Sequence, residues 1–236
     1  MPLNIREHRL PNADALAQSL AADIAQRLLL VLRRQTTATL FVSGGKSPIA
    51  LFKALSARAL PWHAITVSLA DERCAHNTDE ASNALLVRTH LLQDYASSAT
   101  FVPVVDIGPH TPMPSPLTLA DTATQQLANM AGIDVLVLGM GADGHTASLF
   151  PKVSGAALDI DNSDLCVAIQ PANASHERMS LSASAILNSH KILLHIVGDN
   201  KWRVYQAANS SGSIDEMPVR VVLHQPNVPV DVYWSP

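Results

Sequence analysis

The sequence predicts an α/β fold in which a mainly parallel sheet is covered by helices on both faces. Short apolar runs of β-forming residues alternate with amphipathic helical patterns along the chain. Each predicted strand is almost continuously apolar, as strands are when helices bury both faces of a parallel sheet. Apolar residues make up 47% of the chain and charged residues only 15%, against a usual charged share of about 25%. Much of the chain must therefore be buried.

The first predicted element is a long amphipathic helix over residues 12–34, in which leucine or isoleucine recurs every four positions. Asn12 or Asp14 can cap its first turn. An apolar run at 39–42 then ends at Ser43-Gly44-Gly45, and Pro48 opens a second helical pattern that continues to Arg58. This order of strand, glycine turn and helix returns several times. Further strands are expected at 65–69, 100–104, 133–138, 165–169, 191–197 and 230–234, and further helices at 84–92, 117–130 and 200–208.

Residues 106–116 contain four of the fifteen prolines and are expected to form a loop. The chain shows no internal repeat and no clear linker, so we expect residues 1–236 to form a single domain.

The composition excludes several classes of protein. A formal net charge of -4 gives no basic field for a nucleic-acid backbone. Cys74 and Cys166 lie far apart and outside any C-x-x-C pair, so we expect reduced, structural thiols. The longest apolar run, 28–32, is far shorter than the ~20 residues that span a bilayer. Charges occupy the position of a signal-peptide apolar region, so we expect a cytoplasmic protein with no membrane partner.

The first candidate site is the glycine turn F-V-S-G-G-K-S-P, residues 41–48. Gly44 and Gly45 leave backbone N–H groups accessible, and the positive end of the following helix favours an anion such as phosphate. Ser43, Lys46 and Ser47 can add donors. An ordinary tight turn is the alternative. The segment is not a Walker A loop, because that pattern requires glycine at position 40, where this chain has leucine.

The second candidate is D-V-L-V-L-G-M-G-A-D-G-H-T-A-S-L-F-P, residues 134–151, which contains a literal G-x-G-x-x-G after a strand. A dinucleotide turn would open a long helix, but Pro151 follows Gly144 by seven residues. We therefore favour a different function. Gly141 and its neighbouring glycines free the loop of bulk so that His145 can face a substrate as a base, with Asp143 close by.

The third candidate, S-L-A-D-E-R at 68–73, brings two acids and Arg73 to the end of a strand. Alone it would be a surface salt bridge more often than a site. Ligands of parallel sheets bind at the carboxyl ends of the strands, so the loops at 43–47, 71–73 and 139–145 should meet at one rim. Two later cations, Arg178 in H-E-R-M-S-L-S and Lys201 in G-D-N-K, could join them or could be solvated charges.

Other catalytic signatures are missing. The chain has no G-x-S-x-G nucleophile elbow and no H-E-x-x-H helix, because position 180 is serine. The ten histidines are scattered without ligand spacing, which argues against zinc. We expect no metal and no cofactor.

Taken in order, S-G-G-K-S-P, D-E-R, G-M-G-A-D-G-H-T-A-S-L-F-P, E-R-M-S-L-S and G-D-N-K resemble the 6-phosphogluconolactonase family, which is grouped with the glucosamine-6-phosphate isomerases. The resemblance spans nearly the whole chain, and its long glycine-histidine motif is the specific part. Ser47 stands where threonine is common, which keeps the hydroxyl. The resemblance implies a Rossmann-like fold, no metal or cofactor, a phosphorylated sugar lactone as substrate, and a place in the oxidative pentose phosphate pathway. We expect a monomer or a weak homo-oligomer.

Carried onto this sequence, the resemblance implies that His145 is the general base and that Asp71 orients either its imidazole or the sugar. Arg73, Arg178, Lys201 and the N–H groups of Gly44 and Gly45 would hold the phosphate. Two alternatives stay open. A glucosamine-6-phosphate deaminase would need a glutamate where this chain has Phe150. A non-catalytic sugar-phosphate sensor would bind phosphate without turnover, and we expect such a chain to carry a helix-turn-helix ahead of this domain.

Overall fold

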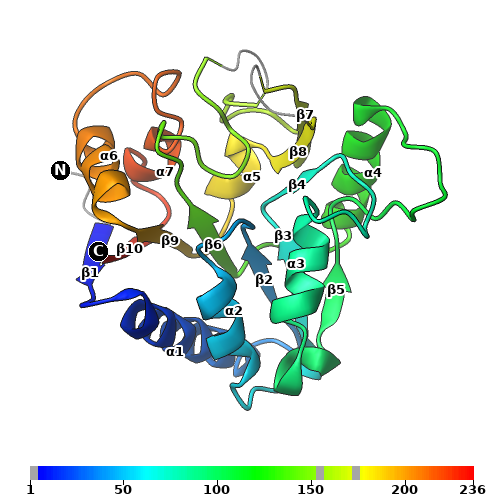
Figure 1. Cartoon of the computed structure of the whole chain (residues 1–236), viewed down its shortest axis with the longest axis horizontal. Helices are drawn as coiled ribbons and strands as arrows, with labels where there is room; N and C mark the ends of the chain where they lie inside the picture. The colour runs from blue at the N-terminus through cyan, green and yellow to red at the C-terminus, as the bar shows by residue number, and fades with distance from the viewer. Residues whose placement is uncertain (1–4, 153–156, 172–175) are drawn as a thin grey trace.

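A seven-stranded parallel sheet forms the centre of the molecule in the computed structural model, which describes residues 5–152, 157–171 and 176–236 (Figure 1). Its strand order is β1-β10-β9-β6-β2-β3-β5, and every neighbouring pair is parallel. The strands are β1 (Ile5–Arg9), β2 (Ala38–Val42), β3 (Ile65–Leu69), β5 (Thr100–Val102), β6 (Val135–Gly139), β9 (Ile192–Val197) and β10 (Val230–Ser235). The predicted α/β, Rossmann-like class with a mainly parallel sheet is confirmed.

Helices lie on both sides of this sheet, with α1 and α2 on one face and α5 and α7 on the other (Figure 1). The helices are α1 (Ala13–Leu32), α2 (Ile49–Ser56), α3 (Asn83–His90), α4 (Pro116–Ala128), α5 (Ala183–Leu187), α6 (Asp199–Asn209) and α7 (Arg220–Leu223), with short 3-10 turns at Trp62–Ala64 and Asp94–Ser98. Asn12 accepts a hydrogen bond from the Ala15 N–H, so it is the residue that caps α1.

A second, three-stranded antiparallel sheet was not expected from the sequence. It contains β4 (Asp71–Arg73), β8 (Arg178–Leu181) and β7 (Cys166–Ile169) in the order β4-β8-β7. The predicted strand at 165–169 is therefore real but belongs to this sheet and not to the central one. Residues 71–73 were expected to be a loop. They become a strand because β8, more than a hundred residues later, pairs with them, and such long-range pairing overrides local propensity.

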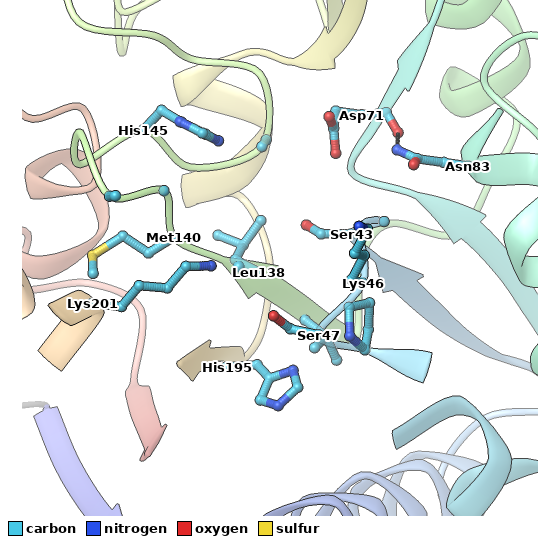
Figure 2. A pocket seen from close by; sticks show the side chains of 18 of the residues that line it. Ser43, Lys46, Ser47, Asp71, Asn83, Leu138, Met140, His145, His195 and Lys201 are labelled. Atoms are coloured by element: carbon cyan, nitrogen blue, oxygen red, sulfur yellow. Dashed lines mark hydrogen bonds between the residues drawn. The ribbon is translucent and has the colours of Figure 1, made fainter. Parts of the chain in front are cut away.

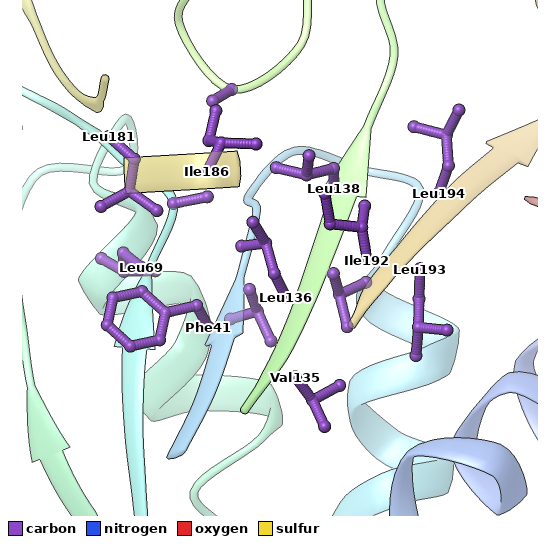
Figure 3. Packing of buried hydrophobic residues seen from close by; sticks show 14 of the residues in the cluster. Phe41, Leu69, Val135, Leu136, Leu138, Leu181, Ile186, Ile192, Leu193 and Leu194 are labelled. Carbon is purple, nitrogen blue, oxygen red and sulfur yellow. The ribbon is translucent and has the colours of Figure 1, made fainter. Parts of the chain in front are cut away.

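The central core explains why the longest helix is so apolar. Helix α1 is long and apolar enough to cross a membrane by length and composition, with a mean hydropathy of 1.4. In the fold, its apolar stripe is buried against the sheet and α2: Leu16, Leu20, Ile24 and Leu28 are all fully buried. On the opposite face, Phe41, Leu136 and Ile186 are among the side chains that fill the space between the sheet and α5 (Figure 3). These contacts fix the relative positions of β2, β6 and β9.

Candidate active site

The three loops expected to meet do so at the carboxyl ends of neighbouring strands. β6, β2 and β3 are adjacent in the sheet, and the segments that follow them enclose a pocket of ≈ 320 Å³ (Figure 2). It is lined by Ser43, Gly44, Gly45, Lys46, Ser47, Pro48, Asp71, Arg73, Asn83, Val137, Leu138, Gly139, Met140, Gly141, Ala142, His145, Ala147, His195 and Lys201. Most residues singled out in the sequence are in this set. Asp143 and Arg178 are outside the lining, but Asp143 contacts the lining residue His145 and Arg178 is paired with the lining residue Arg73.

The two glycines of the first turn are required for different reasons. Gly45 has φ +100°, a left-handed conformation that costs other residues free energy, and no atom lies where its Cβ would be. Gly44 lies beneath the side-chain amide of Asn83, which occupies the space of a Cβ. Asn83 therefore covers Gly44 on the side where a Cβ would be. The buried Ser43 hydroxyl has no hydrogen-bond partner among the described residues.

The second turn is folded to present His145. Thr146 Oγ1 donates to the Gly139 carbonyl at 2.8 Å, and the Gly141 N–H donates to the His145 carbonyl at 2.9 Å, which close the loop. A Cβ on Gly141 would collide with the His145 ring, and Gly144 has φ +82°. After Gly144 the chain forms a tight bridge between Thr146 and Leu149 and no helix follows within the described residues 140–152. The dinucleotide interpretation therefore fails here, as expected.

The His145 imidazole has a carboxylate on one nitrogen and the pocket on its other side. Its Nδ1 lies 2.6 Å from Asp143 Oδ1, and the same oxygen accepts from the His145 backbone N–H at 3.2 Å. The Phe150 ring packs against the imidazole with centroids 4.7 Å apart. Because the carboxylate accepts from Nδ1, the neutral ring carries its proton there and leaves Nε2 as an acceptor. Figure 2 shows the ring extending toward the pocket.

Asp71 has a different partner from the one first considered. Its carboxylate lines the pocket, and Oδ2 accepts a hydrogen bond from Ser148 Oγ at 2.7 Å. The carboxylate bound to the imidazole is Asp143, so the suggestion that Asp71 orients His145 is not supported by this geometry. Asp71 is 7% exposed and lies across the pocket from His145 (Figure 2). It is therefore placed to contact a substrate that lies between the two residues.

The three candidate cations occupy different positions. Lys201, in the first turn of α6, lines the pocket and is half-buried, and this burial lowers the pKa of its ammonium. Arg73 also lines the pocket, where it donates to the Ala81 carbonyl at 2.9 Å and to Asn83. Arg178 is paired with Arg73 across β4 and β8. Burial and then the neighbouring Arg73 lower the pKa of Arg178. Arg178 therefore adds positive charge beside Arg73.

Two lining residues, His195 and Asn83, escaped the sequence analysis. His195 is 5% exposed, and desolvation followed by the charge of Lys201 lowers the pKa of its imidazole to about 4. Its ring is among the side chains that line the pocket (Figure 2). The sequence did contain a signal for His195, because it is the single polar residue in the apolar run I-L-L-H-I-V. Asn83 begins α3 directly after a polar loop, where asparagine is common, so no local signal distinguishes it.

Glu72 was expected beside the site but points away from it. Its side chain is 1% exposed and is absent from the pocket lining. Burial raises the pKa of this carboxyl to about 6, although several backbone N–H groups oppose the shift. Within the described parts of the chain, no three His, Cys, Asp or Glu side chains gather closely enough to hold a metal ion. The ionisable groups of the pocket are thus the cations, Asp71 and the two histidines.

Comparisons with known proteins agree on one family. A sequence profile of the glucosamine-6-phosphate isomerases/6-phosphogluconolactonase family matches residues 11–234. The 6-phosphogluconolactonase of Pseudomonas putida is 37% identical over 100% of this chain and 95% of its own length. That of Pseudomonas aeruginosa is 41% identical over 93% of this chain and 90% of its own. A crystal structure of a 6-phosphogluconolactonase from Shewanella baltica superimposes with a TM-score of 0.92 at 41% identity, with both chains fully covered.

Proposed function

Because this chain belongs to the glucosamine-6-phosphate isomerase/6-phosphogluconolactonase family, we infer that its pocket hydrolyses 6-phospho-glucono-1,5-lactone to 6-phosphogluconate. It is a lactone hydrolase, and this reaction is the ring-opening step of the oxidative pentose phosphate pathway. The substrate is a phosphorylated sugar lactone. A cytoplasmic location, a monomeric or weakly associated state and a single domain over residues 1–236 remain parts of the proposal.

The observation that carries the mechanism is the pairing of His145 with Asp143 at the pocket wall. Nδ1 is held by the carboxylate at 2.6 Å, which leaves Nε2 to accept a proton. We propose that Nε2 takes a proton from water as the water oxygen attacks the lactone carbonyl carbon. The tetrahedral oxyanion then collapses, the bond to the ring oxygen breaks, and the imidazolium returns its proton to that oxygen. General-base catalysis of this kind contributes typically ~100- to 10,000-fold.

Hydrogen-bond donors and cations that line the pocket suit the phosphate. The N–H groups of the Gly44-Gly45 turn and the hydroxyls of Ser43 and Ser47 provide donors, and the unpartnered Ser43 hydroxyl has free capacity. Lys201, which follows β9, supplies a cation, and Lys46 and Arg73 line the same cavity. We propose that these groups bind the phosphate, with Arg178 acting through its charge beside Arg73. Charge-assisted hydrogen bonds make such an anion site strong.

The deaminase alternative is disfavoured by Phe150. Its ring lies against the imidazole, 4.7 Å between centroids, at the position where ring opening by a deaminase needs an acid. A phenyl ring has no proton to exchange, so a second proton shuttle is lacking there. The sensor alternative predicts phosphate binding without turnover. A measurement of lactone hydrolysis separates both alternatives, the deaminase and the sensor, from the hydrolase.

The decisive experiment generates the lactone in place with glucose-6-phosphate dehydrogenase and follows its decay against a buffer control. Wild-type protein should speed the decay, and His145→Asn should lower kcat by ~100-fold or more while the protein stays folded. His110→Asn, at an exposed histidine outside the pocket lining, should behave as wild type. Phosphate-dependent thermal stabilisation without lactone turnover would favour the sensor. A fully active His145→Asn protein would rule out the proposed base.

A further inference from the structure

Asn83 joins three segments of the pocket wall. Its Nδ2 donates to the Asp71 carbonyl at 2.8 Å, and its Oδ1 accepts from the Arg73 guanidinium. The same amide lies over Gly44 so closely that a Cβ there would overlap its oxygen, carbon and nitrogen atoms. The side chain is 1% exposed and lines the cavity (Figure 2). One amide therefore ties β4, the Arg73 side chain and the first glycine turn together.

Glu72 fixes the backbone of Asn83. Its Oε1 accepts from the N–H groups of Arg73 at 2.6 Å and Asn83 at 2.7 Å, and its Oε2 accepts from the N–H of Ala84 at 2.6 Å and from Ser82 Oγ at 3.2 Å. A carboxylate has two acceptor oxygens and no donor, so it satisfies all four groups, whereas a glutamine would turn an N–H₂ toward two of them. The carboxylate therefore connects β4 to the start of α3.

We propose that Asn83 is a positioning residue for the phosphate end of the pocket, held in place by Glu72, and that residue 44 must be glycine to leave room for its amide. This inference rests on the proposed function. Gly44 has no positive φ, unlike Gly45, so an alanine there meets no backbone penalty. The obstacle to alanine at position 44 is the Asn83 side chain.

That distinction makes a double-mutant test possible. In otherwise wild-type protein, Gly44→Ala should displace the Asn83 amide and raise KM for the phosphorylated lactone. Asn83→Ala should raise KM by about tenfold or more, because Arg73 loses a charge-assisted hydrogen bond, and should leave kcat within about threefold. The Gly44→Ala/Asn83→Ala protein should be no worse than Asn83→Ala alone, because the overlapping atoms are gone.

Inhibition by inorganic phosphate provides the readout that a purely structural role would not change. Its inhibition constant should rise in parallel with KM in the Gly44→Ala and Asn83→Ala proteins. Ser115→Ala is the matched control: it removes the cap of α4 at a residue outside the pocket lining, so it should lower the melting temperature and leave KM unchanged. Glu72→Gln should raise KM in the same direction as Asn83→Ala. If Asn83→Ala does not fold, Asn83→Ser serves, since its shorter side chain also clears Gly44.

Multiplicative effects of the Gly44 and Asn83 substitutions would overturn the proposal, and so would an unchanged KM in Asn83→Ala or Glu72→Gln. Absence of lactone hydrolysis by the wild-type protein would instead contradict the proposed function. In that case calorimetric binding of inorganic phosphate to the same variants still tests the role of Asn83, with the same non-additive pattern expected.

Discussion

Replacing Asp143 with asparagine tests how much the carboxylate beside His145 contributes to catalysis. In the proposed mechanism the imidazole becomes a cation when it takes a proton from water, and Asp143 Oδ1 lies 2.6 Å from its Nδ1. Two unit charges about 4 Å apart attract by ~1 kcal/mol in bulk water and by ~4 kcal/mol at an effective dielectric constant of 20. The Asp143 side chain is 51% exposed and that of His145 is 32% exposed, so a value near the solvent limit applies.

An attraction of about 1–2 kcal/mol in the transition state corresponds to about a 5- to 30-fold loss of kcat in Asp143→Asn. KM should stay near the wild-type value, because Asp143 does not line the pocket. Initial rates of lactone decay, corrected for spontaneous hydrolysis, measure both parameters. The difference between the two proteins should shrink at high ionic strength, because salt screens exposed charges. Asp71→Asn is the comparison, and its effect should appear in KM.

A kcat within twofold of wild type, or a loss confined to KM, would refute the assignment of Asp143 as the partner of the base.

Three further outcomes are expected. Lys201→Met should raise KM by about 10- to 100-fold with kcat little changed, since a phosphate loses one charge-assisted hydrogen bond worth ~1.5–3 kcal/mol, and an unchanged KM would place the phosphate elsewhere. Gly45→Ala should lower the free energy of unfolding by ~1–2 kcal/mol in denaturant titrations, because residue 45 has φ +100°. Burial, followed by the charge of Lys201, lowers the pKa of His195 from 6.5 to about 4. Between these two pH values the unfolded chain binds a proton that the folded protein does not. The free energy of unfolding should therefore fall by up to ~3 kcal/mol as the pH drops from 6.5 to 4. Glu72 has the opposite effect on stability, because burial raises its pKa from 4.5 to about 6. The contribution of His195 is therefore measured as the difference between the stability–pH profiles of the wild-type and His195→Asn proteins, since only the wild-type profile contains it.

The parts of the fold that local sequence determines were predictable. Strands such as 65–69 are recognisable because burial on both faces of a parallel sheet favours apolar residues along the whole strand. Turns such as 43–45 are recognisable because glycine adopts backbone conformations that other residues avoid. Strand β1, Ile5–Arg9, was missed because it lies at the sheet edge and carries three charged residues. Strand β8 was missed because it is short and exists through its pairing with β4 and β7. Such elements depend on partners distant in sequence.

The candidate site divides in the same way. The place of the site was predictable from the rule that ligands bind at the carboxyl ends of parallel strands. The same rule selected His145, Lys201 and Arg73, which all line the pocket. The partner of the imidazole did not, because choosing between Asp71 and Asp143 requires side-chain geometry. The role of Asn83 depends on the space above Gly44, which no local pattern encodes.

The imidazole and its carboxylate stand two positions apart on one closed turn, and the anion-binding groups come from separate strand ends. The proposed base and its carboxylate are therefore held by a single turn, and the proposed phosphate-binding groups lie outside that turn. Substitution of the side chains that follow this turn, including Phe150, can therefore change the reaction while the groups proposed to bind the phosphate stay the same. A shared anchor with replaceable reactivity is a physical basis for one scaffold serving both ring-opening hydrolysis and isomerisation.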